Sequence, residues 1–416
     1  SESAFSLLDT HSLLESISEF RDFAVDSNVG FSADLKQKMV DPKNHADAMA
    51  RTDAEAWMEA EHKEIKGLFD RGCFELVDRP ANCKPLMTTM VYKYKYSKSG
   101  EILVRKCRLC VRGDLQREGV DYFKYKTYSA VLNARENRML CALSASMGWS
   151  VFQTDITQAF TYGSLDPGVD IYCQIPSGYP GATENKVLKL CRSVYGLKQA
   201  PAAFKDKLTS FLKSKGFRSV NDAGTVWILQ AGSSVLINAC YVDDVLHFTN
   251  DRKFYHSFRR AFEKEFEIKS SDTVDVYLGN EIIIDSTKKK VALSQSHYIL
   301  SCLDRFGLSD CHGVDLPIRD RLSKQSQPVE PVPADCELYR SMVGSLLYLA
   351  NWTRVDIAFT VSELSRFVSN PGSAHLEAAK RVFRYLKGSV GLHLEYSTRP
   401  TAGFVHAPNQ LWGFVD

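Results

Sequence analysis

The sequence lacks any long hydrophobic run, any internal repeat and any low-complexity segment. Although 44% of its 416 residues are hydrophobic, no apolar stretch approaches the roughly 20 residues that span a bilayer, and no secretory signal opens the chain. These absences argue against a membrane protein and a repeat protein, and the length suggests two or three globular domains. Because the first residue is Ser1, we expect a fragment of a longer polypeptide.

A disulfide framework is also missing. The eleven cysteines are odd in number and irregularly spaced, which favours free thiols in a reducing compartment. Cys107 and Cys110 do form a Cys-x-x-Cys pattern. Positions three apart on a strand point to opposite faces, and no second pair lies nearby, so we do not expect a metal site there.

A large net charge is absent too, since the chain carries only +2. The charge is unevenly distributed, however. Between Lys84 and Lys126 there are eleven Lys or Arg residues and four acidic ones, and six tyrosines occur between Tyr92 and Tyr128. Basic and aromatic residues interleaved in this way suit phosphate contact and base stacking. A solvated basic surface is the alternative.

Apolar spacing predicts mixed helices and strands, which favours the α+β class. Thr52–Glu55 fits a capping box for the first helix, and three prolines from Pro328 to Pro333 mark a linker. We expect helices near 57–68, 137–147, 204–212, 254–262, 298–306, 356–369 and 373–386, and strands at 91–96, 102–111, 151–155, 171–175, 277–284 and 290–293.

Two adjacent aspartates interrupt an apolar run. Asp243 and Asp244 follow Tyr241-Val242 and lie between the strand-like segments 235–240 and 245–248. Two carboxylates at a hairpin turn are costly unless they face water or a cation, and they form an oxygen-only site of the kind that Mg²⁺ prefers. An ordinary Asp-rich turn is the alternative. Asp155 ends another short strand, so its carboxylate converges with this pair if the strands are neighbours in one antiparallel sheet.

Three motifs occur in the order found in reverse transcriptases. They are Gln153–Phe160 (QTDITQAF), Ser193–Pro201 (SVYGLKQAP) and Tyr241–Asp244 (YVDD). The YGLKQAP string closely resembles the Pol polyproteins of copia-type LTR retrotransposons. Further similar segments extend the resemblance from about Asp53 to Glu395. The string at 133–137 differs from the family's, as do Cys107 and Cys110.

The resemblance implies a right-hand polymerase fold of the α+β class, with fingers, palm and thumb around an antiparallel palm sheet, followed by a connection segment. We expect a polar segment at 1–50, fingers and palm at 51–290, a thumb at 291–325 and a connection segment at 326–400. Residues 401–416 resemble the first strand of a ribonuclease H domain. Because only one of that domain's acidic residues is present, we expect no ribonuclease H activity.

The resemblance also assigns site residues. Asp155, Asp243 and Asp244 match the catalytic carboxylates, and together with Ile156 they match the metal site for two Mg²⁺ ions, with Mn²⁺ as an alternative. Phe160 matches an aromatic residue that blocks the ribose 2′-hydroxyl; ordinary core packing is its alternative. The expected nucleotide contacts are Lys106, Arg108, Ala159, Phe160, Gly196 and Gln199, and the expected template–primer contacts are Tyr195, Lys198, Tyr241 and Val242. For Lys106 and Arg108, two apart on one strand face, plain surface charge is the alternative.

The resemblance therefore implies an RNA-directed DNA polymerase. Its partners would be an RNA template, a DNA or tRNA primer, dNTPs and other Gag and Pol products, with no membrane. The expected location is a cytoplasmic virus-like particle, or else the nucleus. One alternative is a decayed or domesticated copy that binds nucleic acid without synthesis. Another two-metal phosphotransferase, such as a nucleotide cyclase, is a third reading, against which the YGLKQAP string argues.

Overall fold

The computed structural model describes residues 39–397, apart from 82, 97–100, 177–178, 180–184, 286–288, 320 and 324–331. The chain divides into two compact units. The larger unit contains the described residues of 39–132 and 150–273, and the smaller unit contains those of 133–149 and 274–397. Each unit is described by itself below.

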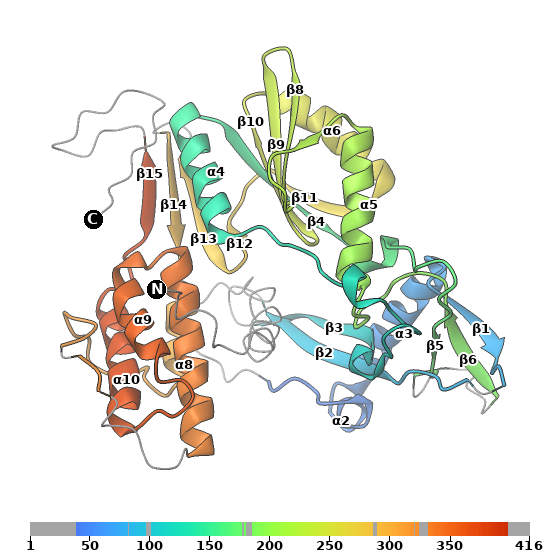
Figure 1. The fold of residues 1–416 in the computed structure, drawn as a ribbon, viewed down its shortest axis with the longest axis horizontal. Helices are drawn as coiled ribbons and strands as arrows, with labels where there is room; N and C mark the ends of the chain where they lie inside the picture. Colours follow the sequence, from blue (N-terminus) through green and yellow to red (C-terminus); the bar gives the residue numbers. More distant parts are fainter. Residues whose placement is uncertain are drawn as a thin grey trace. The chain divides into compact units, whose positions relative to one another are not determined.

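The larger unit contains a six-stranded antiparallel sheet (Figure 1). Its strand order is β11-β4-β10-β9-β8-β7. The strands are β4 (Ser150–Ile156), β7 (Arg218–Ser219), β8 (Val226–Ala231), β9 (Ser234–Tyr241), β10 (Asp244–Thr249) and β11 (Ile268–Ser271).

Two helices, α5 (Ala200–Ser214) and α6 (Arg252–Glu265), bury one face of this sheet with aromatic side chains. Phe152 of β4 stacks on Tyr255 of α6, with ring centroids 4.0 Å apart. Phe211 of α5 packs against Phe262 of α6 at 5.4 Å. Since side chains alternate along a strand, Phe152, Thr154 and Ile156 face these helices, whereas Gln153 and Asp155 lie on the opposite face.

A second part of the larger unit is the hairpin of β2 (Thr88–Tyr96) and β3 (Ile102–Val111) on helix α3 (Ala54–Asp70). Trp57 of α3 contacts the rings of Tyr92 and Tyr94 at 5.4 and 4.9 Å. A three-stranded sheet is also present, in the order β1 (Phe74–Asp78), β6 (Lys186–Leu190) and β5 (Tyr172–Cys173). The short helical elements are α2 (His45–Met49), η1 (Gly113–Leu115), η2 (Lys124–Lys126) and η3 (Ala159–Tyr162).

The smaller unit combines a four-stranded sheet with helices (Figure 1). The strand order is β12 (Val276–Tyr277), β13 (Asn280–Asp285), β14 (Lys290–Ser294) and β15 (Leu394–Ser397). Its helices are α4 (Ala134–Met147), α7 (Ser296–Arg305), α8 (Pro333–Trp352), η5 (Val355–Ile357), α9 (Ala358–Ser365) and α10 (Ser373–Gly388). Leu346, Leu364 and Phe383 are fully buried between α8, α9 and α10.

The structure confirms the main sequence predictions and corrects five details. The helix predicted at 356–369 is the 3-10 helix η5 followed by α9, which ends at Ser365. Helix α3 begins after Asp53, whose side chain makes no cap bond, so the predicted capping box is wrong. The strand predicted at 171–175 is limited to Tyr172–Cys173. The strand predicted at 277–284 is two strands, because Leu278 and Gly279 both have positive φ and turn the chain between β12 and β13. Pro333 begins α8, as its fixed φ allows at a helix start.

Several predictions fall on residues outside the described ranges. These are the polar segment up to residue 38, the turn at 97–100, most of the proline linker and the ribonuclease H-like strand. The named polymerase domains stay predictions, since the two compact units are a coarser division. Within the described residues, none of the helices has the length and apolarity needed to cross a membrane.

Candidate active site

The two adjacent aspartates lie at a tight turn between β9 and β10. Tyr241 is paired with Asp244, so only Val242 and Asp243 form the loop. Val242 has a φ of 54°, a left-handed conformation that costs a β-branched residue about 1–3 kcal/mol. Such strain persists only where the surroundings enforce it. The turn is therefore held in one shape, with Asp243 at its tip.

The sheet register brings Asp155 to this turn. Asp155 of β4 is directly paired with Asp244 of β10, and on its other side it is paired with Lys269 of β11. Cross-strand partners point to the same face. The Ile156 N–H also donates to the Asp243 carbonyl at 2.8 Å. Strands β4 and β10 are therefore neighbours in one antiparallel sheet, which is the condition on which the predicted convergence of the three carboxylates depends.

The aspartates repel one another electrostatically. Burial, together with the charge of Asp155, raises the pKa of Asp243 to about 6. Burial is also the main cause that raises the pKa of Asp244 well above its usual value, although Gln153 Nε2 donates to both its oxygens at 3.0 and 3.2 Å. Neighbouring like charges disfavour the ionised form of a carboxyl group. A bound cation would relieve that cost.

The donor chemistry fits Mg²⁺, but the side chains are not arranged as a finished metal site. The carboxylates of Asp155, Asp243 and Asp244 are hard oxygen donors of the type Mg²⁺ requires. Within the described ranges, however, no group of three or more His, Cys, Asp or Glu side chains is placed to hold an ion. The Asp244 carboxylate instead accepts from Gln153 Nε2 at 3.0 Å. Ile156 has a buried side chain, so only its backbone could serve a metal.

Lys106 and Arg108 occupy one face of β3, as predicted from their spacing. Burial and the neighbouring Arg108 lower the pKa of Lys106, while Asp155 acts in the opposite direction. Burial and these same two cations lower the pKa of Lys95 to about 8. Neither Lys106 nor Arg108 forms an ion pair with any described residue. The three cations form an electropositive surface that is electrostatically coupled to the aspartates.

Phe160 and Tyr195 form an aromatic pair beside this surface. Their ring centroids are 5.1 Å apart in an edge-to-face arrangement, and the Arg108 guanidinium lies 5.5 Å from the Tyr195 ring centroid. Burial raises the pKa of Tyr195, which keeps its hydroxyl protonated. Phe160 is half-buried, so part of its ring is accessible.

Gly196 allows the Tyr195 loop to approach β3. It has a φ of +93°, and a Cβ added there would lie 2.0 Å from the Val111 carbonyl oxygen. The Val111 N–H donates to the Tyr195 carbonyl at 2.9 Å. Only glycine fits this position, and its backbone packs against protein, which gives Gly196 a structural role.

Two predicted nucleotide contacts are buried. The Gln199 side-chain Nε2 donates to the Asp121 carbonyl at 3.0 Å, and its Oε1 accepts from Gln116 Nε2 at 3.0 Å. Ala159 is likewise buried. The Gln199 side chain therefore joins loop segments, and the roles of Gln199 and Ala159 in nucleotide binding stay predictions. Lys198, by contrast, is half-buried and lies with its Nζ 4.7 Å from the Tyr122 ring centroid.

A buried polar chain crosses the opposite face of the same sheet. His247 bonds to Asn238 Oδ1 at 2.8 Å and to Thr154 Oγ1 at 3.0 Å, and Thr154 reaches Ser270 Oγ at 3.2 Å. Burial lowers the pKa of His247 to about 3, so the ring is neutral. These bonds link β9, β10, β4 and β11 directly behind the aspartates and fix their relative positions. The sequence pattern did not reveal this chain, because His247 reads as part of an apolar run.

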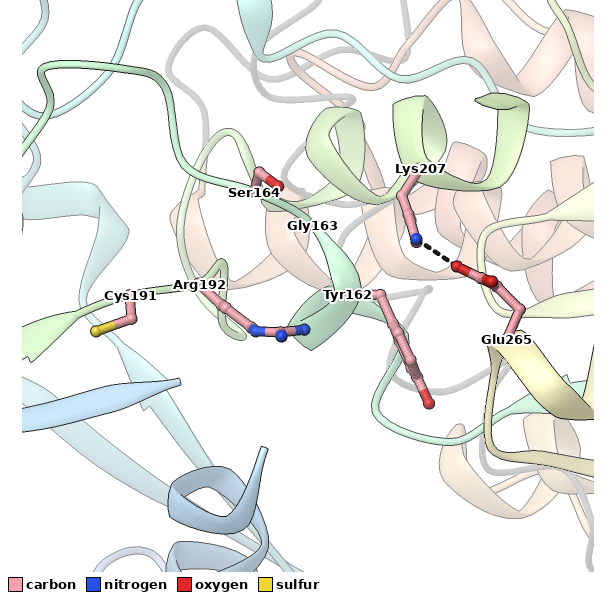
Figure 2. Close-up of a pocket in the computed structure, with 7 residues that line it drawn as sticks. All are labelled: Tyr162, Gly163, Ser164, Cys191, Arg192, Lys207 and Glu265. Carbon is pink, nitrogen blue, oxygen red and sulfur yellow. Dashed lines mark hydrogen bonds and ion pairs between the residues drawn. The ribbon is translucent and has the colours of Figure 1, made fainter. Parts of the chain in front are cut away.

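A cavity of about 430 Å³ lies elsewhere in the larger unit (Figure 2). Lys207 and Glu265 form an ion pair at its wall. The remaining lining residues are Tyr162, Gly163, Ser164, Cys191 and Arg192. None of them is a predicted site residue.

Comparison with known proteins identifies the family. A family model described as "Reverse transcriptase (RNA-dependent DNA polymerase)" matches residues 71–320. The chain belongs to this reverse transcriptase family. The chain combines helices with antiparallel sheets. Together with the family membership, this confirms the α+β polymerase fold class.

Three similar curated proteins come from transposons. The chain is 32% identical over 358 residues to the retrovirus-related Pol polyprotein from transposon TNT 1-94 of Nicotiana tabacum, covering 84% of this chain and 27% of that protein. It is 33% identical over 340 residues to the Pol polyprotein from transposon RE1 of Arabidopsis thaliana, covering 80% and 22%. It is 30% identical over 243 residues to the putative transposon Ty5-1 protein YCL074W of Saccharomyces cerevisiae, covering 58% and 78%. The resemblance to copia-type elements is confirmed, and the chain spans about a quarter of the two plant polyproteins.

One structural comparison is with a foamy viral protease-reverse transcriptase in complex with RNA/DNA hybrid. The sequence identity is 12% and the TM-score 0.39, covering 93% of this chain and 45% of that one. A similarity at this level is too low to support conclusions about function.

Proposed function

We propose that this chain is the polymerase segment of a copia-type Pol polyprotein and acts as an RNA-directed DNA polymerase. The observation that carries the proposal is the pairing of Asp155 with Asp244, next to a turn that presents Asp243. In the reaction the primer 3′-oxygen attacks the α-phosphorus of a dNTP, the bond to pyrophosphate breaks, and the hydroxyl proton is released.

Two divalent ions, Mg²⁺ or Mn²⁺, would be held by the three aspartates and the Ile156 backbone, and would activate the 3′-hydroxyl and stabilise the leaving pyrophosphate. Lys106 and Arg108 would bind the triphosphate through charge-assisted hydrogen bonds. Phe160, supported by Tyr195, would exclude a ribose 2′-hydroxyl. Tyr241, Val242 and Lys198 would contact template and primer.

The partners in this proposal are an RNA template, a DNA or tRNA primer and dNTPs, within a cytoplasmic virus-like particle. The test is primer extension on an RNA template with Mg²⁺, with Mn²⁺ and with chelator. Metal-dependent extension supports the proposal. Tight, salt-dependent RNA binding with no nucleotide incorporation under any condition would contradict it and favour a decayed copy that only binds nucleic acid.

A further inference from the structure

A single carboxylate, Glu64 of α3, lies between strand β3 and the loop that follows β4. The Leu109 N–H donates to Glu64 Oε1 at 3.4 Å, and Gln158 Nε2 donates to Glu64 Oε2 at 3.0 Å. Each carboxylate oxygen therefore accepts from a different segment. The longer bond is the weaker of the two, and together they tie both segments to one helix.

The first of these segments is the outer edge of β3. Because β2 and β3 form a two-stranded sheet, alternate amides of β3 point away from β2 and need other acceptors. The Leu109 N–H uses Glu64, and the Val111 N–H uses the Tyr195 carbonyl at 2.9 Å. Arg108 immediately precedes Leu109, so this docked edge determines where the cationic face of β3 lies.

The second segment is the loop between Asp155 and Phe160. Gln158 has a φ of 51°, a left-handed conformation that costs a non-glycine residue about 1–2 kcal/mol. Its carbonyl accepts from the Thr161 N–H at 2.9 Å and from Thr161 Oγ1 at 2.7 Å. A strained residue keeps its conformation only when neighbours restrain it, and Glu64 is the neighbour that holds its side chain.

The charge of Glu64 is not used in an ion pair with any described residue. Burial raises its pKa, and the charges of Arg108 and Lys106 act in the opposite direction. A partly buried carboxylate without a salt bridge contributes poorly to stability. Its bonds to two functional segments give a physical reason for its presence.

We propose that Glu64 is a positioning residue that fixes the triphosphate-binding face of β3 and the Phe160 loop in one register. This inference rests on the proposed polymerase function. It assigns no direct contact with substrate to Glu64. Its effect would reach the substrate through Arg108 on one side and through Gln158 and Phe160 on the other.

The experiment compares dNTP and rNTP incorporation, as kcat and KM, in the parent chain and four variants. In E64Q the amide oxygen still accepts from Leu109 and the NH₂ group donates to Gln158 once that amide turns, so we expect parent-like sugar discrimination. E64A removes both acceptors. Q158N introduces asparagine, which tolerates positive φ but has a side chain too short to reach Glu64. For both variants we expect the preference for dNTP over rNTP to fall about 10- to 100-fold, because small misplacements near a reaction centre have effects of this size. E59Q, an exposed acid on the same helix, is the matched control.

Each of the following results decides for or against the positioning role of Glu64. An active parent whose E64A and Q158N variants discriminate like E59Q overturns the inference alone. Equal losses in E64Q and E64A overturn it as well, because the charge and not the hydrogen bonds would then matter. If E64A fails to fold, as judged by circular dichroism, Q158N gives the answer. A parent chain that extends no primer overturns the proposed function and, with it, this inference.

Discussion

Asp155 and Asp244 are direct cross-strand partners on β4 and β10. Two carboxylates placed opposite each other in a sheet destabilise it, and Asp243, one residue away, adds a third. The fold accepts this cost while a tight turn, a glutamine and a buried polar chain fix the three residues in place. Such an arrangement is typical of residues kept for function and not for stability.

Replacing Asp243 with asparagine should abolish most primer extension. The change keeps the shape of the side chain and removes the charge that a cation needs. We expect a loss of at least about 100-fold in activity, because even the loss of a residue that only supports a metal ligand costs about 10- to 100-fold. Primer extension with Mg²⁺ measures this, with Asp272→Asn as control, because Asp272 is an exposed aspartate of the same unit. Equal extension by the parent and the Asp243 variant would contradict the assignment of Asp243 as a catalytic residue.

Shrinking Phe160 to valine should increase ribonucleotide incorporation. The smaller side chain leaves room where the ring now packs against Tyr195, and we expect the preference for dNTP over rNTP to fall by about 10- to 100-fold. The ratio of kcat/KM values for the two sugars is the measurement. Phe254→Val, in the aromatic layer on α6, is the control. An unchanged ratio would leave Phe160 with a packing role only.

Replacing Gly196 with alanine should disrupt the contact between the Tyr195 loop and β3. The added Cβ would lie 2.0 Å from the Val111 carbonyl oxygen, so we expect destabilisation of about 1–3 kcal/mol or more, together with lost activity. Gly119→Ala is the matched control, since Gly119 also has a positive φ but open space around it. Urea unfolding of both variants measures the difference. Similar losses in the two would show that backbone strain, and not the close approach, limits position 196.

The buried His247 should make the protein less stable as the pH falls from about 6.5 towards 3. Its pKa is lowered from 6.5 to about 3, first by burial and then by the charge of Arg259. Below pH 6.5 the unfolded chain binds a proton that the folded chain does not, which favours unfolding. This single group can remove up to about 1.4 kcal/mol of stability per pH unit within that range.

Urea unfolding of the parent and of His247→Gln, at several pH values between 7 and 4, tests this titration. The variant cannot take up the proton, so its stability should decline less steeply with acidification even if it is lower at pH 7. Carboxylates shared by both proteins contribute equally and cancel in the comparison. Identical pH slopes would show that His247 does not titrate between the two states.

The sequence by itself determined the α+β class, most helices and strands, and the residues of the aspartate site. It could do so because apolar periodicity and turn residues act over short distances, and because the motifs that identify a reverse transcriptase are contiguous. Lys106 and Arg108 share a face for the same local reason, the two-residue repeat of a strand.

Only the tertiary structure showed which predicted contact residues are buried, as Gln199 and Ala159 are. The burial of Gln199 depends on Gln116, 83 positions earlier, and the pairing of Lys269 with Asp155 joins strands more than a hundred positions apart. The roles of Glu64 and His247 likewise arise from partners far away in the chain. Register and burial are properties of the assembled sheet, so no local pattern in the chain encodes them.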